Sequence, residues 1–145
     1  MFNAGNPVTL LVPMLVVVVL TYLAFLKLGA ARMAALKGGA VDAGYYRAHI
    51  GAGEGEAATV ANRHYINLFE MPVLFYAACL SGYVLNPGSI WVLGLAWGYV
   101  AGRVIQSAVH LTYNNPMHRG MGFFLAVLCL GALWINLALV IFDRL

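Results

Sequence analysis

The sequence predicts an all-α integral membrane protein, a bundle of four transmembrane helices in up-down order. Its 145 residues are 63% hydrophobic and 9% charged, whereas a soluble domain carries about 25% charged residues. The mean hydropathy is +0.84, so lipid is the expected surroundings of most of the chain. The length suffices for about four helices of roughly 20 residues each. No basic run with interleaved aromatic residues is present, so no nucleic-acid partner is predicted.

Four long apolar runs mark the expected transmembrane helices within a single domain, residues 1–145. Unpaired backbone N–H and C=O groups are costly in hydrocarbon, and the runs are about twice the length of a barrel strand, so helices are favoured over strands. A Gly-rich polar segment separates the first run from the second and forms the one substantial loop. The expected spans cover residues 8–36, 61–85, 90–113 and 116–142, and this loop covers residues 37–60.

Local sequence signals place the starts of the last two spans. The turn "NPGS" ends the second span, and Ser89 can cap the third. The turn "NNPMHRG" ends the third span, with Asn115 as cap and Pro116 at the first helical position of the fourth. Connections this short predict antiparallel neighbours.

The positions of the basic residues predict the orientation in the membrane. They gather around the first loop and at the third, whereas the second loop and the N-terminal tail hold no Lys or Arg. The positive-inside rule therefore places loops one and three in the cytoplasm and both termini outside. The membrane itself, a bacterial inner membrane or the endoplasmic reticulum, is left open. The basic residues concerned are Lys27, Arg32, Lys37, Arg47, Arg63 and Arg119.

Polar side chains recur at helical spacing on one face of the second span and on one face of the third. The two sets are Arg63, Asn67 and Glu70 on the second span and Arg103, Gln106 and His110 on the third. Counted from the cytoplasmic ends, Glu70 and Arg103 both lie roughly 14 Å deep at about 1.5 Å per residue. The same count predicts Asn67 at the level of Gln106, and Arg63 at the level of His110.

These polar sets allow two interpretations. A charged residue in mid-membrane costs about 2.5–3.5 kcal/mol on insertion scales, so Glu70 and Arg103 are expected to face protein or water, most simply each other. The first interpretation is a structural ion pair that fixes the register of the two helices. The second is a polar pocket for a charged ligand, because ionisable groups inside a membrane are candidates for functional sites.

Further arginines at the cytoplasmic level favour the pocket. Arg32 ends the first span, Arg119 begins the fourth, and Arg63 lies at the same level. Several arginines around one carboxylate suit a small cytosolic anion with several carboxylates, because a guanidinium group binds a carboxylate with two hydrogen bonds. For Arg32 and Arg63 the alternative is snorkelling to lipid phosphates. Arg119 stands at a helix N-terminus, where the helix dipole disfavours a cation unless an anion lies nearby.

Two stretches of the sequence resemble a known membrane family. "RHYINLFE", residues 63–70, is similar to the R-x-x-x-N-x-x-E motif on the second helix of the MAPEG family, the membrane-associated proteins in eicosanoid and glutathione metabolism. "GRVIQSAVHLTYNNPMHRG" resembles the family's third-helix arginine and the arginine early in its fourth helix. The resemblance covers nearly the whole chain. It implies a homotrimer in the lipid bilayer that binds glutathione between neighbouring subunits, near the cytosolic side.

The resemblance also implies roles for individual residues. Arg119 would be the catalytic residue, beside the glutathione sulfur, where its charge would stabilise the thiolate. The second substrate would be a lipophilic electrophile or a lipid hydroperoxide that enters from the bilayer, and no metal is needed. The implied glutathione ligands are Arg32, Arg63, Asn67, Glu70 and Arg103, with His110 and Tyr113 as further candidates late in the third helix.

The chain departs from the family pattern at two positions. His110 stands where the transferase and synthase branch often has a tyrosine that contacts glutathione, and Gly120 stands where some members have serine. The resemblance thus implies a membrane-bound glutathione-dependent transferase or peroxidase. The alternative is a non-catalytic protein of the same fold that binds lipid or stabilises a complex with an unidentified protein partner. A small transporter or channel is disfavoured, because no two matched spans carry helix-breaking Gly or Pro.

Overall fold

The computed structural model describes residues 6–49 and 53–145, and this part of the chain is helical, without strands. The predicted outer tail and first loop include residues 1–5 and 50–52, which lie outside the described residues. Four segments are long and apolar enough to cross a membrane, as predicted. They are Pro7–Lys37, Glu56–Leu85, Ile90–Leu111 and Pro116–Asp143.

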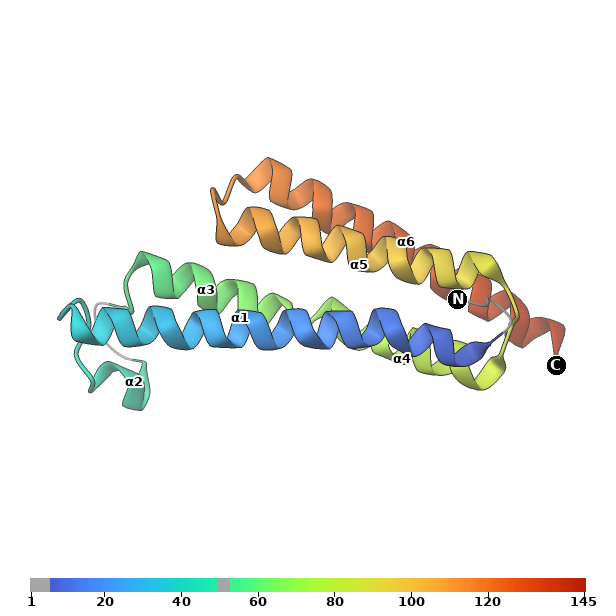
Figure 1. The fold of residues 1–145 in the computed structure, drawn as a ribbon, viewed down its shortest axis with the longest axis horizontal. Coiled ribbons are helices and arrows are strands. Elements are labelled where there is room, and N and C mark those ends of the chain that lie inside the picture. Colours follow the sequence, from blue (N-terminus) through green and yellow to red (C-terminus); the bar gives the residue numbers. More distant parts are fainter. Residues whose placement is uncertain (1–5, 50–52) are drawn as a thin grey trace.

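The four membrane-length segments run up and down through the bundle (Figure 1). One end of the bundle holds the connections from the first segment to the second and from the third to the fourth. The other end holds the start of the first segment, the connection from the second to the third, and the end of the fourth. The elements are η1 (Pro7–Leu10), α1 (Leu11–Lys37), α2 (Tyr45–Ala48), α3 (Glu56–Asn67), α4 (Met71–Leu85), α5 (Ile90–Leu111) and α6 (Pro116–Asp143).

The second membrane-length segment is two helices, which corrects the prediction of one continuous span over residues 61–85. It starts earlier, at Glu56, and a turn over residues 68–70 separates α3 from α4. Pro72 accounts for the break, because proline lacks an N–H donor and its ring would clash with the carbonyl of Leu68 in a regular helix. Glu70, which precedes α4, has the non-helical angles φ −85° and ψ −89°.

The boundaries of the last two helices follow the predicted signals in part. Asn115 caps α6, since its side chain accepts hydrogen bonds from the backbone N–H groups of Met117 and His118. Pro116 is the first residue of α6, as predicted. Ser89 precedes α5, but its side chain makes no capping hydrogen bond.

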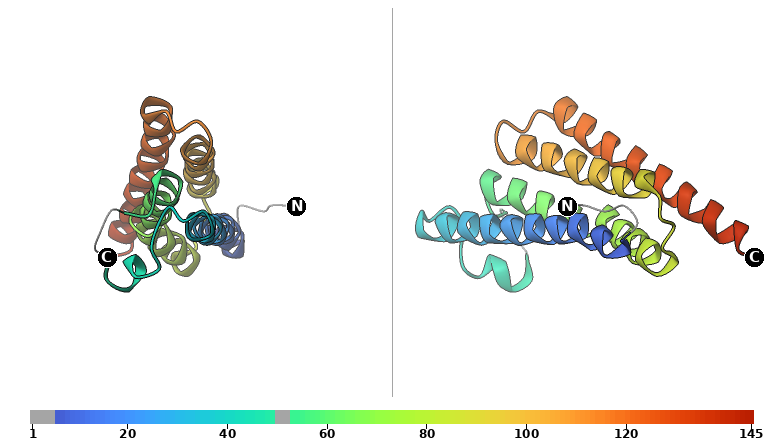
Figure 2. Two further views of the ribbon diagram at one scale, coloured as in Figure 1. Left: turned by 90° about the vertical axis from the view of Figure 1, so that its left-hand side faces the viewer. Right: turned by 45° about the vertical axis from the view of Figure 1, so that its right-hand side comes forward.

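α5 and α6 pack closely along much of their length (Figures 1 and 2). Glycine permits this approach: a Cβ atom at Gly102 would lie 2.7 Å from the backbone N of Ala126 and from the backbone O of Gly122. A Cβ atom at Gly122 would lie 2.8 Å from the backbone N of Gln106. Any larger side chain at these positions would therefore push the two helices apart.

The main apolar core and most of the buried polar side chains lie in different parts of the bundle. The apolar core lies toward the α4–α5 connection, where the rings of Phe75 and Tyr99 stack with centroids 4.1 Å apart. Toward the other end, α5 and α6 diverge from α1 and α3 (Figure 2). Buried polar side chains on α3 and α5 face this end of the bundle and define the candidate site. They are His64, Arg103, Gln106, Ser107 and His110.

Candidate functional site

Asn67, the last residue of α3, is the centre of a hydrogen-bond network inside the membrane-length part of the bundle. Arg103 on α5 donates from Nη2 to the backbone oxygen of Asn67 at 3.0 Å. Gln106 donates from Nε2 to the Asn67 Oδ1 atom at 3.1 Å. Asn67 in turn donates from Nδ2 to the Glu70 Oε2 atom at 3.1 Å. The break after Asn67 makes this possible, because a carbonyl at a helix end has no intrahelical partner.

The network confirms one predicted pairing and corrects another. Asn67 and Gln106 meet, as their equal depth in the membrane predicted. Glu70 and Arg103 do not form the expected direct pair: among the described residues, Glu70 is linked to Arg103 through Asn67. The turn before α4 accounts for the difference, because it leaves the side chain of Glu70 exposed on the single chain.

Arg103 is fully buried and only partly hydrogen-bonded. Its Nε and Nη1 atoms have no hydrogen-bond partner among the described residues. The guanidinium carbon lies 5.9 Å from the ring centroid of Phe123 on α6, within cation–π range. Burying a cation with few partners is costly, so the bond to the Asn67 carbonyl and the nearby carboxylate of Glu70 are its main compensation.

A pair of histidines takes the place that the sequence prediction gave to Arg63 and His110. The rings of His64 and His110 lie with centroids 4.9 Å apart, and both residues are buried. Arg63 is exposed instead. The prediction placed Arg63 opposite His110. The residue that faces His110 is instead His64, which follows Arg63 in α3 and points about 100° away from it around the helix. A histidine beside the predicted arginine was a signal that the pattern of charged residues alone did not use.

Arg119 lies in the first turn of α6, half-buried, where Asn114 orients it. Its Nη1 atom donates to the Asn114 Oδ1 atom at 2.9 Å, and Asn114 has a positive φ of 46° in the α5–α6 connection. Tyr113 is exposed, and its hydroxyl lies 3.0 Å from the Nδ1 atom of His118. A Cβ atom at Gly120 would meet no atom within 4 Å, so packing within the chain does not require glycine there.

A cleft of about 550 Å³ opens between α1, α3 and the C-terminal end of α5. His110, Tyr113 and Asn114 line one side of it, and Val60 and Ala61 line the other. Lys27 also lines the cleft and donates from Nζ to the backbone oxygen of Leu111 at 2.9 Å. The prediction of orientation counts Lys27 among the basic residues around the first loop. Its position inside a long apolar helix could have marked it as a site candidate.

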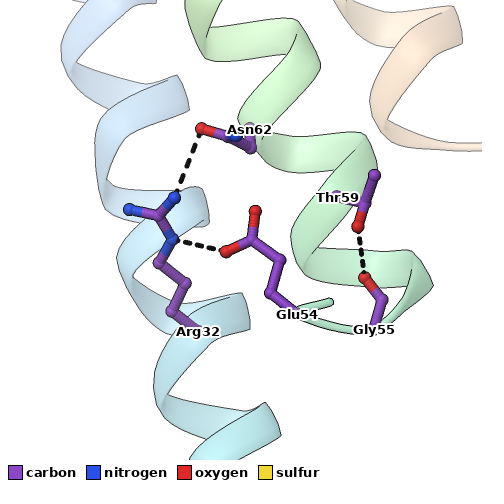
Figure 3. A network of polar contacts seen from close by, with 5 residues as sticks. All are labelled: Arg32, Glu54, Gly55, Thr59 and Asn62. Carbon is purple, nitrogen blue, oxygen red and sulfur yellow. Dashed lines mark hydrogen bonds and ion pairs between the residues drawn. The ribbon is translucent and has the colours of Figure 1, made fainter. Parts of the chain in front are cut away.

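Arg32 near the end of α1 holds the first loop against α3 (Figure 3). Its Nε atom lies 2.8 Å from the Glu54 Oε2 atom in an ion pair. Its Nη2 atom donates to the Asn62 Oδ1 atom at 3.4 Å. Glu54 is 4% exposed, whereas the Arg32 side chain is 31% exposed. The prediction did not include Glu54, because a single carboxylate in a Gly-rich loop shows no periodic pattern.

Tyr46 on α2 completes the arrangement around Arg32. The Arg32 guanidinium carbon lies 5.4 Å from the Tyr46 ring centroid. Burial and the negative charge of Glu54 raise the pKa of the Tyr46 hydroxyl, so this phenol stays neutral at physiological pH. Arg32 is thus engaged by the loop on one edge and open to solvent on the other.

The predicted site residues form three groups on the single chain. The first is the network of Asn67, Glu70 and Arg103, and the second is the cleft with His110 and Tyr113, with Arg119 nearby on Asn114. The third is Arg32 with its loop partners. Arg63 belongs to none of these groups and is exposed. The cleft of the second group is lined by no residue of the first or the third group.

An apolar groove lies on a different face, between α1 and the α3–α4 segment. Its volume is about 360 Å³. Thr21 and Tyr76 are polar groups within it, and aromatic rings form most of its walls. The rings are Tyr22, Phe25, Tyr65, Phe69 and Tyr76. Phe69 directly precedes Glu70, so the groove and the polar network are adjacent along the chain.

Comparison with known proteins agrees with the resemblance in the sequence motifs. The sequence model of the MAPEG family matches residues 10–139 of the 145-residue chain. In comparisons with curated proteins and with solved structures, no match was found. The family match covers most of the chain and accords with its four membrane-length helices, and it supports a role connected with glutathione at the level of the family. The chain belongs to the MAPEG family.

Proposed function

We propose that the protein is a membrane-bound, glutathione-dependent transferase or peroxidase that acts on lipophilic electrophiles or lipid hydroperoxides. The observation that carries this proposal is the network around Asn67. Arg103, Asn67 and Glu70 correspond to the family motif residues, and they are joined by hydrogen bonds of 3.0 and 3.1 Å. The exposed Glu70 carboxylate can pair with the ammonium group of a tripeptide, while the buried Arg103 holds Asn67 and Glu70 in position through its bond to the Asn67 carbonyl.

Arg119 is the residue proposed to activate the thiol. It stands in the first turn of α6, where the helix dipole favours an anion, and Asn114 fixes its guanidinium group by a hydrogen bond of 2.9 Å. A thiol of about pKa 8.5 is mostly protonated at neutral pH. A nearby cation favours the thiolate, which is the nucleophile. The proton released on ionisation passes to water at the cytoplasmic end.

The thiolate has two possible reactions with a lipophilic partner. With an electrophile, the sulfur forms a new bond to carbon and the leaving group departs with its electron pair. With a hydroperoxide, two thiols are oxidised to one disulfide while the peroxide is reduced to an alcohol and water. In both cases the protein supplies positioning of the thiolate and stabilisation of its charge.

A homotrimer is part of the proposal, because the site is open on the single chain. The side chains of Arg63 and Glu70 are exposed, and Arg119 is half-buried. The cleft beside His110 and Tyr113 is lined neither by the Asn67 network nor by Arg32. A second copy packed against this face would cover the exposed side chains of Arg63 and Glu70. The glutathione site would then lie between two subunits.

The aromatic groove supports the lipophilic half of the proposal. It faces the apolar surroundings and offers ring surfaces over about 360 Å³, enough for part of an acyl chain or an aryl group. The same groove also favours the second candidate function, a lipid-binding protein without catalysis. The absence of a side-chain donor at Gly120 points the same way.

The two functions are separated by binding and turnover with purified protein in detergent. Glutathione binding is measured by calorimetry, followed by conjugation of 1-chloro-2,4-dinitrobenzene and reduction of a fatty-acid hydroperoxide. Native mass spectrometry gives the number of subunits. Glutathione binding with turnover supports the enzyme, binding of lipid without turnover supports the second function, and a monomer without glutathione binding contradicts the proposed site.

A further inference from the structure

The ion pair between Arg32 and Glu54 has a consequence for ligand binding, and the inference rests on the proposed glutathione function. The Glu54 carboxylate is nearly fully buried and lies 2.8 Å from the Arg32 Nε atom. The Arg32 side chain is 31% exposed, so an anion from the cytoplasmic side can reach the guanidinium group. The charge that Arg32 would offer to a ligand is therefore already balanced by a carboxylate of the same chain.

The guanidinium group of Arg32 has five N–H donors on two edges. Glu54 and Asn62 accept from the edge formed by Nε and Nη2. A ligand carboxylate that binds Arg32 with two hydrogen bonds through this edge must therefore replace Glu54. Two carboxylates held at the same edge would repel each other at short range.

The backbone on both sides of Glu54 suits such an exchange. Gly53 and Gly55 have positive φ angles of 94° and 79°, which glycine adopts without strain. Gly55 is tied to α3, because the Thr59 hydroxyl donates to its backbone oxygen at 2.8 Å (Figure 3). Rotation at Gly53 can therefore carry the Glu54 side chain away from Arg32 while α3 keeps its first turn.

We infer that Glu54 occupies, in the ligand-free protein, the place at Arg32 that a carboxylate of glutathione takes in the complex. Binding then releases the loop around Glu54. The closed loop lowers the apparent affinity in proportion to the fraction of molecules that are closed, so a tenfold excess of the closed form weakens binding about tenfold. Glu54 is in this sense a residue that sets affinity and does not itself contact the ligand.

The test compares Glu54→Gln with the wild type, in the full-length protein purified in detergent. Glutamine keeps the shape of the side chain but removes its charge. We expect glutathione to bind Glu54→Gln about tenfold more tightly by calorimetry. Hydrogen exchange of the backbone amides of residues 53–62 should speed up when glutathione is added to the wild type. In Glu54→Gln this exchange should be fast before any ligand is added.

Asp42→Asn is the matched control, because Asp42 lies in the same loop and bonds only locally, accepting a hydrogen bond from the Gly44 backbone N–H. It loses the same charge and should bind glutathione with wild-type affinity. Should Glu54→Gln fail to fold, Glu54→Asp keeps the charge but shortens the reach to Arg32. The same tightening and loop exchange are expected for it.

The outcomes distinguish this inference from the proposed function. If the wild type binds glutathione and Glu54→Gln binds it equally or more weakly, the inference is overturned. Glu54 then has only a structural role, and the proposed function stays in place. Binding by Glu54→Gln but not by the wild type would support the inference. Absence of glutathione binding by both proteins would overturn the inference and the proposed function together.

Discussion

Arg103 on α5 donates a hydrogen bond to the backbone oxygen of Asn67, at the point where the second membrane segment changes from α3 to α4. A break inside an apolar segment leaves carbonyl groups without helical partners, which is costly in hydrocarbon unless another donor replaces them. The buried arginine supplies that donor, and the carbonyl supplies one of the few partners that the arginine has. The helix break and the buried charge therefore stabilise each other.

Replacing Pro72 by alanine should allow α3 and α4 to join. Alanine restores the N–H donor and removes the clash with the carbonyl of Leu68, so residues 68–70 can become helical. The Asn67 carbonyl would then bond within the helix and be lost to Arg103. Hydrogen exchange should slow at residues 68–74, and glutathione binding should weaken, because the network that holds Asn67 and Glu70 in position loses its bond to Arg103. Unchanged exchange would show that Arg103, and not Pro72, maintains the break.

Asn67→Ala should destabilise the fold, because the side chain serves both Gln106 and Glu70. Loss of these bonds leaves the buried amide of Gln106 without its partner, at a cost of about 1–3 kcal/mol in the free energy of unfolding. Asn136→Ala is the control, since the Asn136 side chain donates to the Ala132 carbonyl, one turn away on the same helix. Unfolding in mixed micelles measures both variants, and equal stability of the two would contradict the central role of Asn67.

Arg119→Ala should leave folding and the number of subunits unchanged. It should reduce the rate of conjugation by about 100-fold or more, which is the usual effect of removing one group that stabilises an anion in the active site. The ultraviolet absorbance of bound thiolate should fall, and its titration should move to higher pH, because the cation that favours ionisation is gone. Arg144→Ala, at the exposed end of the chain, provides a control of equal charge. Wild-type turnover in Arg119→Ala would remove this residue from the mechanism.

Gly102→Ala should lower stability, because the new Cβ atom would lie 2.7 Å from backbone atoms of α6 that cannot yield without moving the helix. Overpacking of this kind costs about 1–3 kcal/mol. Gly131→Ala on α6 is the matched change, since a Cβ atom there meets nothing within 4 Å. It should be neutral, or stabilising by up to about 1 kcal/mol through helix propensity. A destabilised Gly131→Ala would indicate a contact with another subunit at that position.

The membrane-length helices and their approximate ends could be predicted from apolar runs and turn signals, because lipid imposes these constraints locally along the chain. The pairing of Asn67 with Gln106 was also predictable, from equal depth on two antiparallel helices. The prediction failed where it assumed a regular helix through residues 61–85. Pro72 was the available signal, and the break at residues 68–70 turns Glu70 away from Arg103.

The contacts of Arg32 were beyond sequence reasoning for a different reason. Its partners come from a loop and from α3, 22 and 30 residues along the chain. Such contacts depend on how the loop folds back, which neither periodicity nor composition encodes. His64, and not Arg63, faces His110 because of how α3 is rotated about its own axis. The pattern of charged residues alone did not determine this rotation.

The glycine contact between α5 and α6 also determines how the end of the bundle at the α5–α6 connection can move. Because the two backbones lie close together at Gly102 and Gly122, we expect α5 and α6 to move as one unit. Widening the cleft beside His110 would therefore require both helices to move away from α1 and α3. The hydrogen bond from Lys27 to the Leu111 carbonyl joins α1 to the end of α5, so it opposes that movement.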